Sequence, residues 1–274
     1  MSAVDRVVVL GSGYAGTAVA RLARLRGLRV VTNVRKDERA ARLRAEGFEV
    51  IAGDAPDAAS AARIDARTQV VIAFPPDPQV DERLAPRLAG AGAVTHVSST
   101  GVYGDHRGVL NDSTAVPAPD PRCGRLLAAE ETYRGRGATV LRCPGIYGPD
   151  RGLHVRVVRG EHRVPGDGTR FLSRVHIDDL AQFVLGAPSA PGETFVVGDL
   201  EPAPHIEVVR FLCGAYGVAM PPHVPLESVH ASLRADRRVD ASRAIAVLGV
   251  ALTFPTYREG MSPSATGLRA GSPA

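Results

Sequence analysis

Short apolar runs rich in β-branched residues alternate with longer Ala-, Leu- and Arg-rich stretches along the first half of this 274-residue chain. Six of these runs are expected to form strands, at residues 6–10, 28–34, 48–53, 69–74, 94–99 and 138–143. The stretches between them have helical spacing. Strands that are apolar nearly throughout are typical of a parallel sheet covered by helices on both faces. The alternation therefore predicts an α/β fold, with a doubly wound parallel sheet of the Rossmann type over residues 1–150.

After Pro144 the regular alternation of strand-like and helix-like segments ends, and loops rich in Gly and Pro follow. Segments that follow a nucleotide-binding sheet usually build the substrate side of its cleft, because ligands bind beyond the carboxyl ends of the strands. We expect residues 151–260 to form a smaller C-terminal substrate lobe, which can return to the core. Within it, helices are expected near 175–186, 205–217 and 240–249, and a strand near 193–198. The Gly-, Ser- and Pro-rich tail at 261–274 is predicted to be disordered.

Composition argues against several classes of partner. The 33 basic residues are interleaved with 29 acidic ones, so the net charge of +4 does not indicate a nucleic-acid partner. Cys123, Cys143 and Cys213 lie far apart and form no CxxC, which favours neither a disulfide framework nor a metal site. The sequence shows no secretory signal pattern and no apolar run of membrane-spanning length, so we expect a cytoplasmic protein without a membrane partner.

The segment VVVLGSGYAG places Gly11, Gly13 and Gly16 at GxGxxG spacing between the first expected strand and a helix. Glycines at these positions permit a tight turn, close approach of the backbone to a pyrophosphate, and packing of the helix on the strand. The phosphates would lie at the positive end of the helix. We therefore predict dinucleotide binding, and we add Tyr14 in the loop and Phe74 at the end of the fourth expected strand to the cofactor contacts.

The end of the second expected strand indicates which nicotinamide cofactor is bound. NAD enzymes present an acid to the ribose hydroxyls there, whereas this chain has Thr32, Asn33 and Val34 followed by Arg35 and Lys36. A basic side chain attracts a 2′-phosphate, so NADP(H) is favoured over NAD(H). The alternative is that both basic residues are merely solvated.

The third expected strand is followed by Asp54. Its carboxylate is a candidate acceptor for the adenine amino group. It is equally a candidate cap for the next helix.

Several motifs then follow in an order and spacing that suggest a family. They are SSTGVYGD at 98–105, LRCPGIYGPDR at 141–151, RVHIDDLA at 174–181, and RRVDASRA with FPTYREG near the end. Together with the glycine loop, they make the chain resemble the extended and atypical short-chain dehydrogenases, relatives of the epimerases and dehydratases. The resemblance implies that Ser99 donates a hydrogen bond to the reacting oxygen of the substrate. It also implies cofactor contacts at Ser98, Cys143 and Pro144, although serines are common in turns at strand ends.

That family carries Tyr-x-x-x-Lys on the helix after the serine motif. Aligning LAAEE at 127–131 with the family helix puts Arg122 at the tyrosine position and Leu126 at the lysine position. The only lysine of the chain is Lys36, far from this helix in the sequence. Without a nearby ammonium group a tyrosine keeps a pKa of about 10, so at neutral pH it donates a proton but seldom accepts one.

Other side chains are candidates for the missing chemistry. Tyr103 and Tyr147 are candidate proton donors, although aromatic residues in such motifs often only pack. Arg122 stays charged at any working pH, so it could hold a substrate anion or a developing oxyanion, or simply be solvated at the helix start. His106 and His176 could carry protons by their pKa alone.

Three functions are compatible with these residues. We favour an NADPH-dependent reductase of a small carbonyl or imine metabolite with a non-standard proton donor, since hydride transfer belongs to the cofactor. The alternatives are a non-redox isomerase, lyase or cyclase on the same fold, and a catalytically silent NADP(H)-sensing or partner-binding protein. The expected partner is a small-molecule substrate. The resemblance also suggests a homodimer, because members of the family often pair through two helices.

Overall fold

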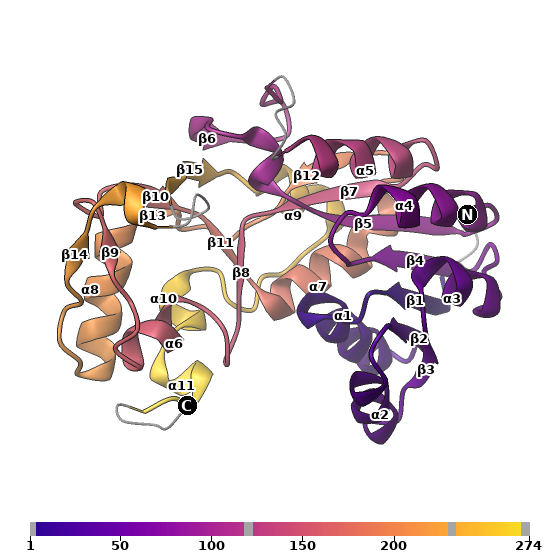
Figure 1. The fold of residues 1–274 in the computed structure, drawn as a ribbon, viewed down its shortest axis with the longest axis horizontal. Coiled ribbons are helices and arrows are strands. Elements are labelled where there is room, and N and C mark those ends of the chain that lie inside the picture. Colours follow the sequence, from indigo (N-terminus) through magenta and orange to yellow (C-terminus); the bar gives the residue numbers. More distant parts are fainter. Residues whose placement is uncertain (1–3, 118–122, 230–233, 270–274) are drawn as a thin grey trace.

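The computed structural model describes residues 4–117, 123–229 and 234–269, and a seven-stranded parallel sheet forms its core. The strand order is β12-β7-β5-β4-β1-β2-β3 (Figure 1). The strands are β1 (Arg6–Leu10), β2 (Arg29–Val34), β3 (Glu49–Ala52), β4 (Thr68–Ile72), β5 (Ala93–Ser99), β7 (Thr139–Cys143) and β12 (Thr194–Val196). The six strands expected first and the later one near 193–198 are all confirmed, and with them the doubly wound sheet.

Alternate residues of each central strand face opposite layers of helices. On β1, Val7 and Val9 pack in one cluster, whereas Val8 and Leu10 pack in the other, and none of the four is more than 1% exposed. The first layer contains α1 (Tyr14–Leu25), α2 (Asp37–Ala45), α7 (Ile177–Gly186) and α9 (Ser242–Leu248). The second contains α3 (Ala55–Ala61), α4 (Pro78–Leu84), η1 (Ala85–Leu88) and α5 (Gly124–Arg134). Burial on both faces explains why these strands are apolar nearly throughout.

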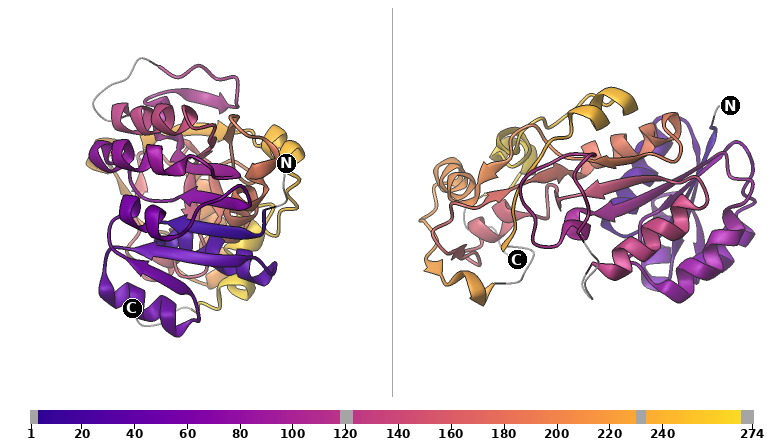
Figure 2. Two further views of the ribbon diagram at one scale, coloured as in Figure 1. Left: turned by 90° about the vertical axis from the view of Figure 1, so that its right-hand side faces the viewer. Right: turned by 90° about the horizontal axis from the view of Figure 1, so that it is seen from above.

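A smaller lobe lies beyond one end of the sheet (Figures 1 and 2). Its helices are α6 (Leu153–Val158), α8 (His205–Tyr216), α10 (Tyr257–Gly260) and α11 (Pro263–Thr266), with η4 (Leu226–Ser228). Two short ladders complete it, β9 (Val164–Pro165) with β14 (His223–Val224) and β10 (Phe171–Leu172) with β13 (Ala203–Pro204). Leu153, Val209, Leu212 and Tyr257 belong to its own apolar core.

Two parallel strand pairs connect the lobe to the sheet. They are β8 (Gly145–Tyr147) with β11 (Arg174–His176), and β6 (Arg107–Leu110) with β15 (Asp236–Val239). The turn η2 (Thr100–Tyr103) follows β5, and η3 (Ala187–Ser189) follows α7. Because β12, α7 and α9 belong to the core, the lobe expected over 151–260 is not continuous in sequence: the chain returns to the sheet within it.

The tail predicted to be disordered from residue 261 is ordered as far as the described residues reach, to Arg269. Met261 is 2% exposed, and its carbonyl accepts a hydrogen bond from the Tyr216 hydroxyl at 3.0 Å. Ser262 caps α11 by accepting from the Ala265 amide. The composition of this segment is that of a flexible tail, but burial of one large apolar side chain and a helix cap order it.

None of the helices in the described ranges combines the length and apolarity needed to cross a bilayer.

A buried ion pair ties α5 to the ends of β5 and β7. Glu130 is 0% exposed and accepts from the Ser98 hydroxyl at 2.6 Å and from Arg142 Nη2 at 2.7 Å. Arg142 in turn donates from Nη1 to the Tyr103 hydroxyl at 3.0 Å. Burial alone raises the Glu130 pKa, but the hydrogen bonds and charge of Arg142 and the Ser98 hydroxyl outweigh it, so that the pKa lies below its ordinary value.

We expect Glu130→Gln to lower the free energy of unfolding by about 3 kcal/mol or more, because it leaves the buried Arg142 charge uncompensated. The matched control is Glu131→Gln on the same helix, whose side chain is 80% exposed and whose ion pair with Arg134 lies at the surface. That variant should lose at most about 1 kcal/mol. Chemical denaturation of both variants measures the difference, and equal losses would contradict a structural ion pair.

The same pair predicts a pH dependence of stability. A carboxylate with a depressed folded-state pKa contributes fully above its unfolded pKa of about 4.3 and loses its contribution as the pH falls through the folded value. The stability difference between wild type and Glu130→Gln should therefore shrink below that pH. Denaturation at neutral and acidic pH checks it, and a constant difference would contradict the charged state of Glu130.

Candidate cofactor and substrate site

The glycine loop between β1 and α1 has the close packing that its spacing predicts. Gly11 has a φ of +88°, and a Cβ there would lie 2.8 Å from the Phe74 Cβ. A Cβ on Gly16 would collide with the Gly11 carbonyl oxygen and lie 2.9 Å from Val9 Cγ1. Both positions thus require glycine for reasons internal to the fold, and Phe74 packs directly over the loop.

Gly13 differs from the other two glycines because a Cβ there would meet no atom within 4 Å. It is the N-cap of α1, and no side chain caps this end of the helix. The first turn of α1 contains no acidic residue either. Uncapped amides at a positive helix end, facing open space, form a suitable site for a pyrophosphate.

Tyr14 begins α1 and joins the loop to the segment after β8. Its hydroxyl donates to Asp150 Oδ1 at 3.2 Å, and the Arg151 guanidinium lies 4.9 Å from its ring centroid. Burial and the Asp150 carboxylate raise the Tyr14 pKa well above its ordinary range, so the phenol stays protonated. The side chain expected at the cofactor therefore links the sheet to the lobe.

Basic side chains lie beside the glycine loop at the end of β2. Arg35 and Lys36 are exposed, as a role in binding a 2′-phosphate requires. Arg39 on α2, which the sequence analysis did not single out, donates from Nε to the Ser12 carbonyl at 2.6 Å. It also donates from Nη2 to the Thr17 hydroxyl at 3.3 Å, so a guanidinium lies directly at the loop.

Asn33 and Asp54, near β3, have different environments. The buried Asn33 amide donates to the carbonyls of Ile51 and Gly53, at 3.1 and 2.9 Å, and so ties β2 to β3. Asp54 is exposed at the start of α3 and makes no capping hydrogen bond. Of the two roles considered for Asp54, capping is not observed, and the carboxylate is accessible to an adenine.

Ser98 and Ser99 at the end of β5 point to opposite sides of the strand. We expected Ser98 to contact the cofactor. Its side chain is instead buried, and its hydroxyl donates to Glu130 in the core. Ser99 is half-buried and lines a cavity at the sheet edge, and its hydroxyl accepts a hydrogen bond from the Gly101 amide at 3.0 Å. Its own proton is available for a substrate oxygen.

The position aligned with the family lysine holds an aliphatic side chain beside Ser99. A Cβ on Gly101 would lie 3.1 Å from Leu126 Cδ1 and 3.2 Å from the Ser99 hydroxyl oxygen. Leu126 therefore lies near Ser99, and its correspondence to the family lysine stays a prediction of the alignment. Arg122 lies outside the described residues.

Tyr103 is not placed for the expected role of proton donor. Its side chain is fully buried and its hydroxyl accepts a hydrogen bond from Arg142. A phenol enclosed in the core cannot contact a substrate. The motif position thus serves packing and the buried ion pair.

Tyr147 lines the cavity with its ring, which packs edge-on against His176 at a centroid distance of 5.1 Å. Its hydroxyl lies against Gly260 of α10 and has no hydrogen-bond partner within the part of the chain that the structure describes. Burial, with the Asp199 charge, raises its pKa far above the ordinary range, so it can only act as a donor. A role in proton transfer stays a hypothesis for this residue.

The segment after β7 divides between core and cavity. The Cys143 thiol is buried and donates to the Leu141 carbonyl at 3.4 Å, so only the backbone of Cys143 is available to a cofactor. Pro144 lines the cavity beside Ser99, as expected for a residue at the nicotinamide. Burial raises the Cys143 pKa, which keeps the thiol neutral.

The candidate histidines are held by backbone contacts. His176 caps α7 by accepting from the Asp178 amide at 3.2 Å, and burial with the neighbouring His154 lowers its pKa to about 4. It is therefore neutral at pH 7 and has a structural role. The His106 ring lies 3.3 Å from the Val109 carbonyl in the segment joining η2 to β6.

The cavity itself has a volume of about 750 Å³ and extends from the sheet edge into the lobe. At one end it is lined by Ser99, Thr100 and Pro144, and at the other by α6, the start of α8 and Met261. Five arginines line it, against two acidic residues. The arginines are Arg151, Arg156, Arg159, Arg174 and Arg237.

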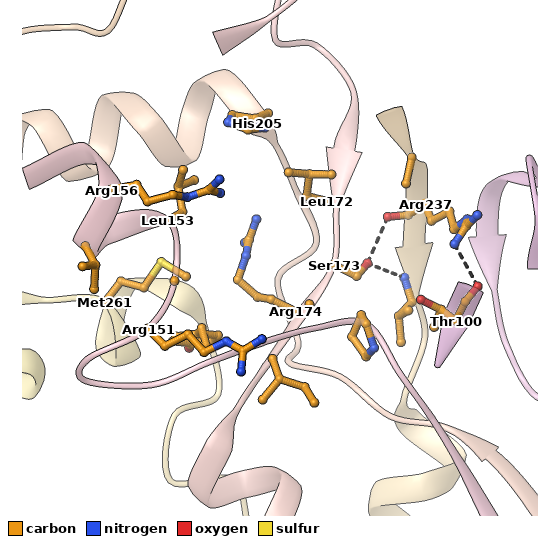
Figure 3. Close-up of a pocket in the computed structure, with 18 of the residues that line it drawn as sticks. Thr100, Arg151, Leu153, Arg156, Leu172, Ser173, Arg174, His205, Arg237 and Met261 are labelled. Carbon is orange, nitrogen blue, oxygen red and sulfur yellow. Dashed lines mark hydrogen bonds between the residues drawn. The ribbon is translucent and has the colours of Figure 1, made fainter. Parts of the chain in front are cut away.

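Arg237 holds the loop that follows Ser99. It donates to the carbonyls of Thr100 at 2.8 Å, of His106 at 3.3 Å and of Gly104. The dashed contact to Thr100 is visible in Figure 3. The Arg237 guanidinium is thus engaged with backbone oxygens of this loop.

Comparison with known proteins agrees with this architecture. No protein-family model and no curated protein matches the chain significantly. Among solved structures, a conserved protein of unknown function from Silicibacter pomeroyi DSS superposes with a TM-score of 0.81 and 26% identity, covering 96% of this chain and 98% of that one. UDP-glucuronic acid 4-epimerase from Bacillus cereus, solved with UDP-glucuronic acid and NAD, superposes with a TM-score of 0.78 and 19% identity, covering 95% of this chain and 97% of that one. A proposed NAD-dependent epimerase/dehydratase from Methylobacillus flagellatus superposes with a TM-score of 0.71 and 24% identity, covering 94% of this chain and 96% of that one.

The fold is that of the NAD-dependent epimerases and dehydratases. In this epimerase/dehydratase fold β1 and β5 both flank β4, so the glycine loop, Phe74 and Ser99 meet at the carboxyl edge of the sheet. That edge is where ligands of open parallel sheets bind. The resemblance drawn from the motifs thus holds at the level of the fold.

We predict opposite effects for alanine at two glycines of the loop. Gly16→Ala should destabilise the protein by about 2 kcal/mol, because its Cβ overlaps Gly11 and Val9. Gly13→Ala should melt like wild type, since its φ of −72° suits alanine and its Cβ meets open space. It should nevertheless bind a nicotinamide dinucleotide about tenfold or more weakly, because the methyl group occupies the pyrophosphate position. Calorimetry and thermal melting measure both, and unchanged binding by Gly13→Ala would exclude the loop as the site.

Proposed function

We propose that this protein is an NADP(H)-dependent reductase of a small carbonyl or imine metabolite. The observation that carries the proposal is Ser99, whose hydroxyl lines a cavity at the cofactor edge of the sheet with Leu126 nearby instead of a lysine. Hydride transfer needs the cofactor, a hydrogen-bonding group on the reacting oxygen or nitrogen, and a proton source. Ser99 supplies the second of these.

The charge state of the cavity favours reduction over oxidation. Oxidation of an alcohol requires a base, and family members obtain one by placing a lysine charge next to a tyrosine. With Leu126 at that position, no ammonium group is there to lower the pKa of a phenol. Burial and the Asp199 charge raise the pKa of Tyr147, so this phenol stays protonated and cannot serve as the base. An epimerase, which must both remove and return hydride, is less compatible with these residues than a reductase.

The cofactor is proposed to be NADP(H). The exposed Arg35 and Lys36, with Arg39 beside the loop, offer cations to a 2′-phosphate, and no acid lies among Thr32, Asn33 and Val34. The similar structures from Bacillus cereus contain NAD, which makes NAD(H) the alternative.

We predict that Arg35→Asp binds NADPH about tenfold or more weakly while NADH binding is kept or improved, because the acid repels the 2′-phosphate. Arg29→Asp, an exposed change at the other end of the same strand, is the matched control and should alter neither affinity. Titrations following the fluorescence of the reduced nicotinamide measure both. Equal loss of NADPH and NADH binding would contradict 2′-phosphate recognition.

Alanine variants of Ser98 and Ser99 test the catalytic role of Ser99. Screening small ketones, aldehydes and imines for loss of NADPH absorbance should first identify a substrate. With that substrate, Ser99→Ala should lower kcat by about 100-fold and leave NADPH affinity and melting temperature unchanged. Ser98→Ala should instead lower stability by about 1.5 kcal/mol, since Glu130 loses a hydrogen bond.

The screen also separates the alternatives. NADPH binding without oxidation by any compound would contradict the reductase and favour a sensing or partner-binding protein. Product formed without net consumption of NADPH would favour a non-redox isomerase, lyase or cyclase.

A further inference from the structure

The arginines of the cavity have few negative partners. Of the two acidic residues that line it, Asp150 already accepts from the Tyr14 hydroxyl, and Glu161 follows α6 at the rim. Several surface arginines pair with carboxylates, as Arg21 does with Glu46 and Arg258 with Glu201. Two of the cavity arginines, Arg156 and Arg174, have no such partner among the described residues.

Arg174 is the most unusual of these arginines. It lies on β11 and is 5% exposed, yet in the described part of the chain its guanidinium makes neither an ion pair nor a hydrogen bond, and Nη1 is fully buried without an acceptor. Its nearest ring contact is Tyr257, with 5.0 Å from the guanidinium carbon to the ring centroid. Arg142, by contrast, is similarly buried but fully engaged by Glu130.

An uncompensated charge in the interior is costly. Removing a guanidinium from water costs several kcal/mol, and burial lowers the Arg174 pKa even though the charge of nearby Asp199 acts to raise it. Asp199 itself is buried, which raises its pKa to about 7 against the lowering effect of Arg174. The two side chains lie beyond ion-pair distance, so the Asp199 charge acts on Arg174 but leaves its Nη1 without a hydrogen-bond acceptor.

A second cation faces the first. Figure 3 shows the guanidinium groups of Arg156, from α6, and Arg174, from β11, directed toward each other below His205. Arg156 is half-buried and forms no ion pair with a residue of the described ranges. His205 is held by His162, with 2.8 Å between their Nε2 atoms, and burial with the charge of its neighbours lowers its pKa to about 3. It is neutral at pH 7 and does not add a third charge. Two guanidinium groups that converge on a cavity favour an oxyanion between them.

We propose that Arg174 and Arg156 bind an anionic group, a carboxylate or a phosphate, on the substrate. The inference rests on the proposed function, because Ser99 and Arg174 line the same cavity and a molecule can contact both. It narrows the substrate class to small carbonyl or imine compounds that carry an acid group. The acid group binds in the lobe, and the reacting carbon lies toward Ser99.

Direct anion binding tests the site without any substrate. Inorganic phosphate and malonate, titrated separately without cofactor, should each raise the melting temperature of the wild type or give a calorimetric signal, and the tighter of the two identifies the class. Arg174→Met should weaken the tighter anion about tenfold or more, and Arg156→Gln should weaken it as well. Arg83→Gln, a surface change of equal charge whose partner is Asp57, is the control and should bind like wild type. Unchanged affinity in Arg174→Met, or no anion binding by wild type, would overturn the proposal.

Stability without anions distinguishes a binding residue from a structural one. If Arg174 is held unpaired for a ligand, Arg174→Met should melt at or above the wild-type temperature, because it removes a buried charge. A lower melting temperature would indicate a structural role and contradict the proposal. Arg174→Lys keeps the charge without the planar fork and should restore part of the anion affinity.

NADPH titration separates this inference from the proposed function. Arg174→Met should bind NADPH like wild type, since the glycine loop is intact. If wild type binds phosphate or malonate through Arg174 but binds no nicotinamide nucleotide, the reductase fails and the anion site stands. If it binds NADPH and neither anion, the reductase stands and the anion site fails.

Discussion

Glu130 places a negative charge inside the α/β core, where Ser98 on β5 and Arg142 on β7 donate to it and Arg142 also holds Tyr103. The ends of two sheet strands, the turn after β5 and helix α5 are thereby fixed relative to one another. Ser99 follows Ser98 on the same strand, and successive side chains of a strand point to opposite faces. Because Ser98 points into the buried network, Ser99 points into the cavity. When all of its hydrogen-bonding groups are paired, a buried ion pair of this kind fixes the relative positions of the elements it joins and also stabilises the fold.

The cavity next to this network contains an arginine in a different environment. Arg142 is neutralised by the Glu130 carboxylate, whereas Arg174 is equally buried and has no ion-pair partner among the described residues. A fold tolerates unpaired buried charge when binding needs it, at a cost in stability. The contrast between Arg142 and Arg174 supports our proposal that a substrate anion binds at the lobe side of the cavity.

Helix α5 carries both Glu130 and Leu126. Glu130 belongs to the buried network, and Leu126, one turn earlier, lies near the Ser99 loop. If the alignment with the short-chain dehydrogenases holds, an aliphatic side chain stands where a lysine is expected. This combination is consistent with a reaction that needs proton donation to the product and no proton removal from it.

Much of the fold and the packing of the glycine loop could be predicted from the sequence, because both depend on residues close together in the chain. β1 is a short, nearly continuous apolar run, and glycines follow it at positions 11, 13 and 16. Other assignments depended on which face of an element meets which neighbour. The sequence could not tell Ser98 from Ser99, place the Tyr103 phenol in the core, or show that Met261 packs and orders the tail. Arg174 stood in a motif, but its lack of a partner is a property of the surrounding chain. Periodicity and close backbone contacts are local and can be read from residue order. The compensation of charge is decided only when residues distant in sequence are brought together.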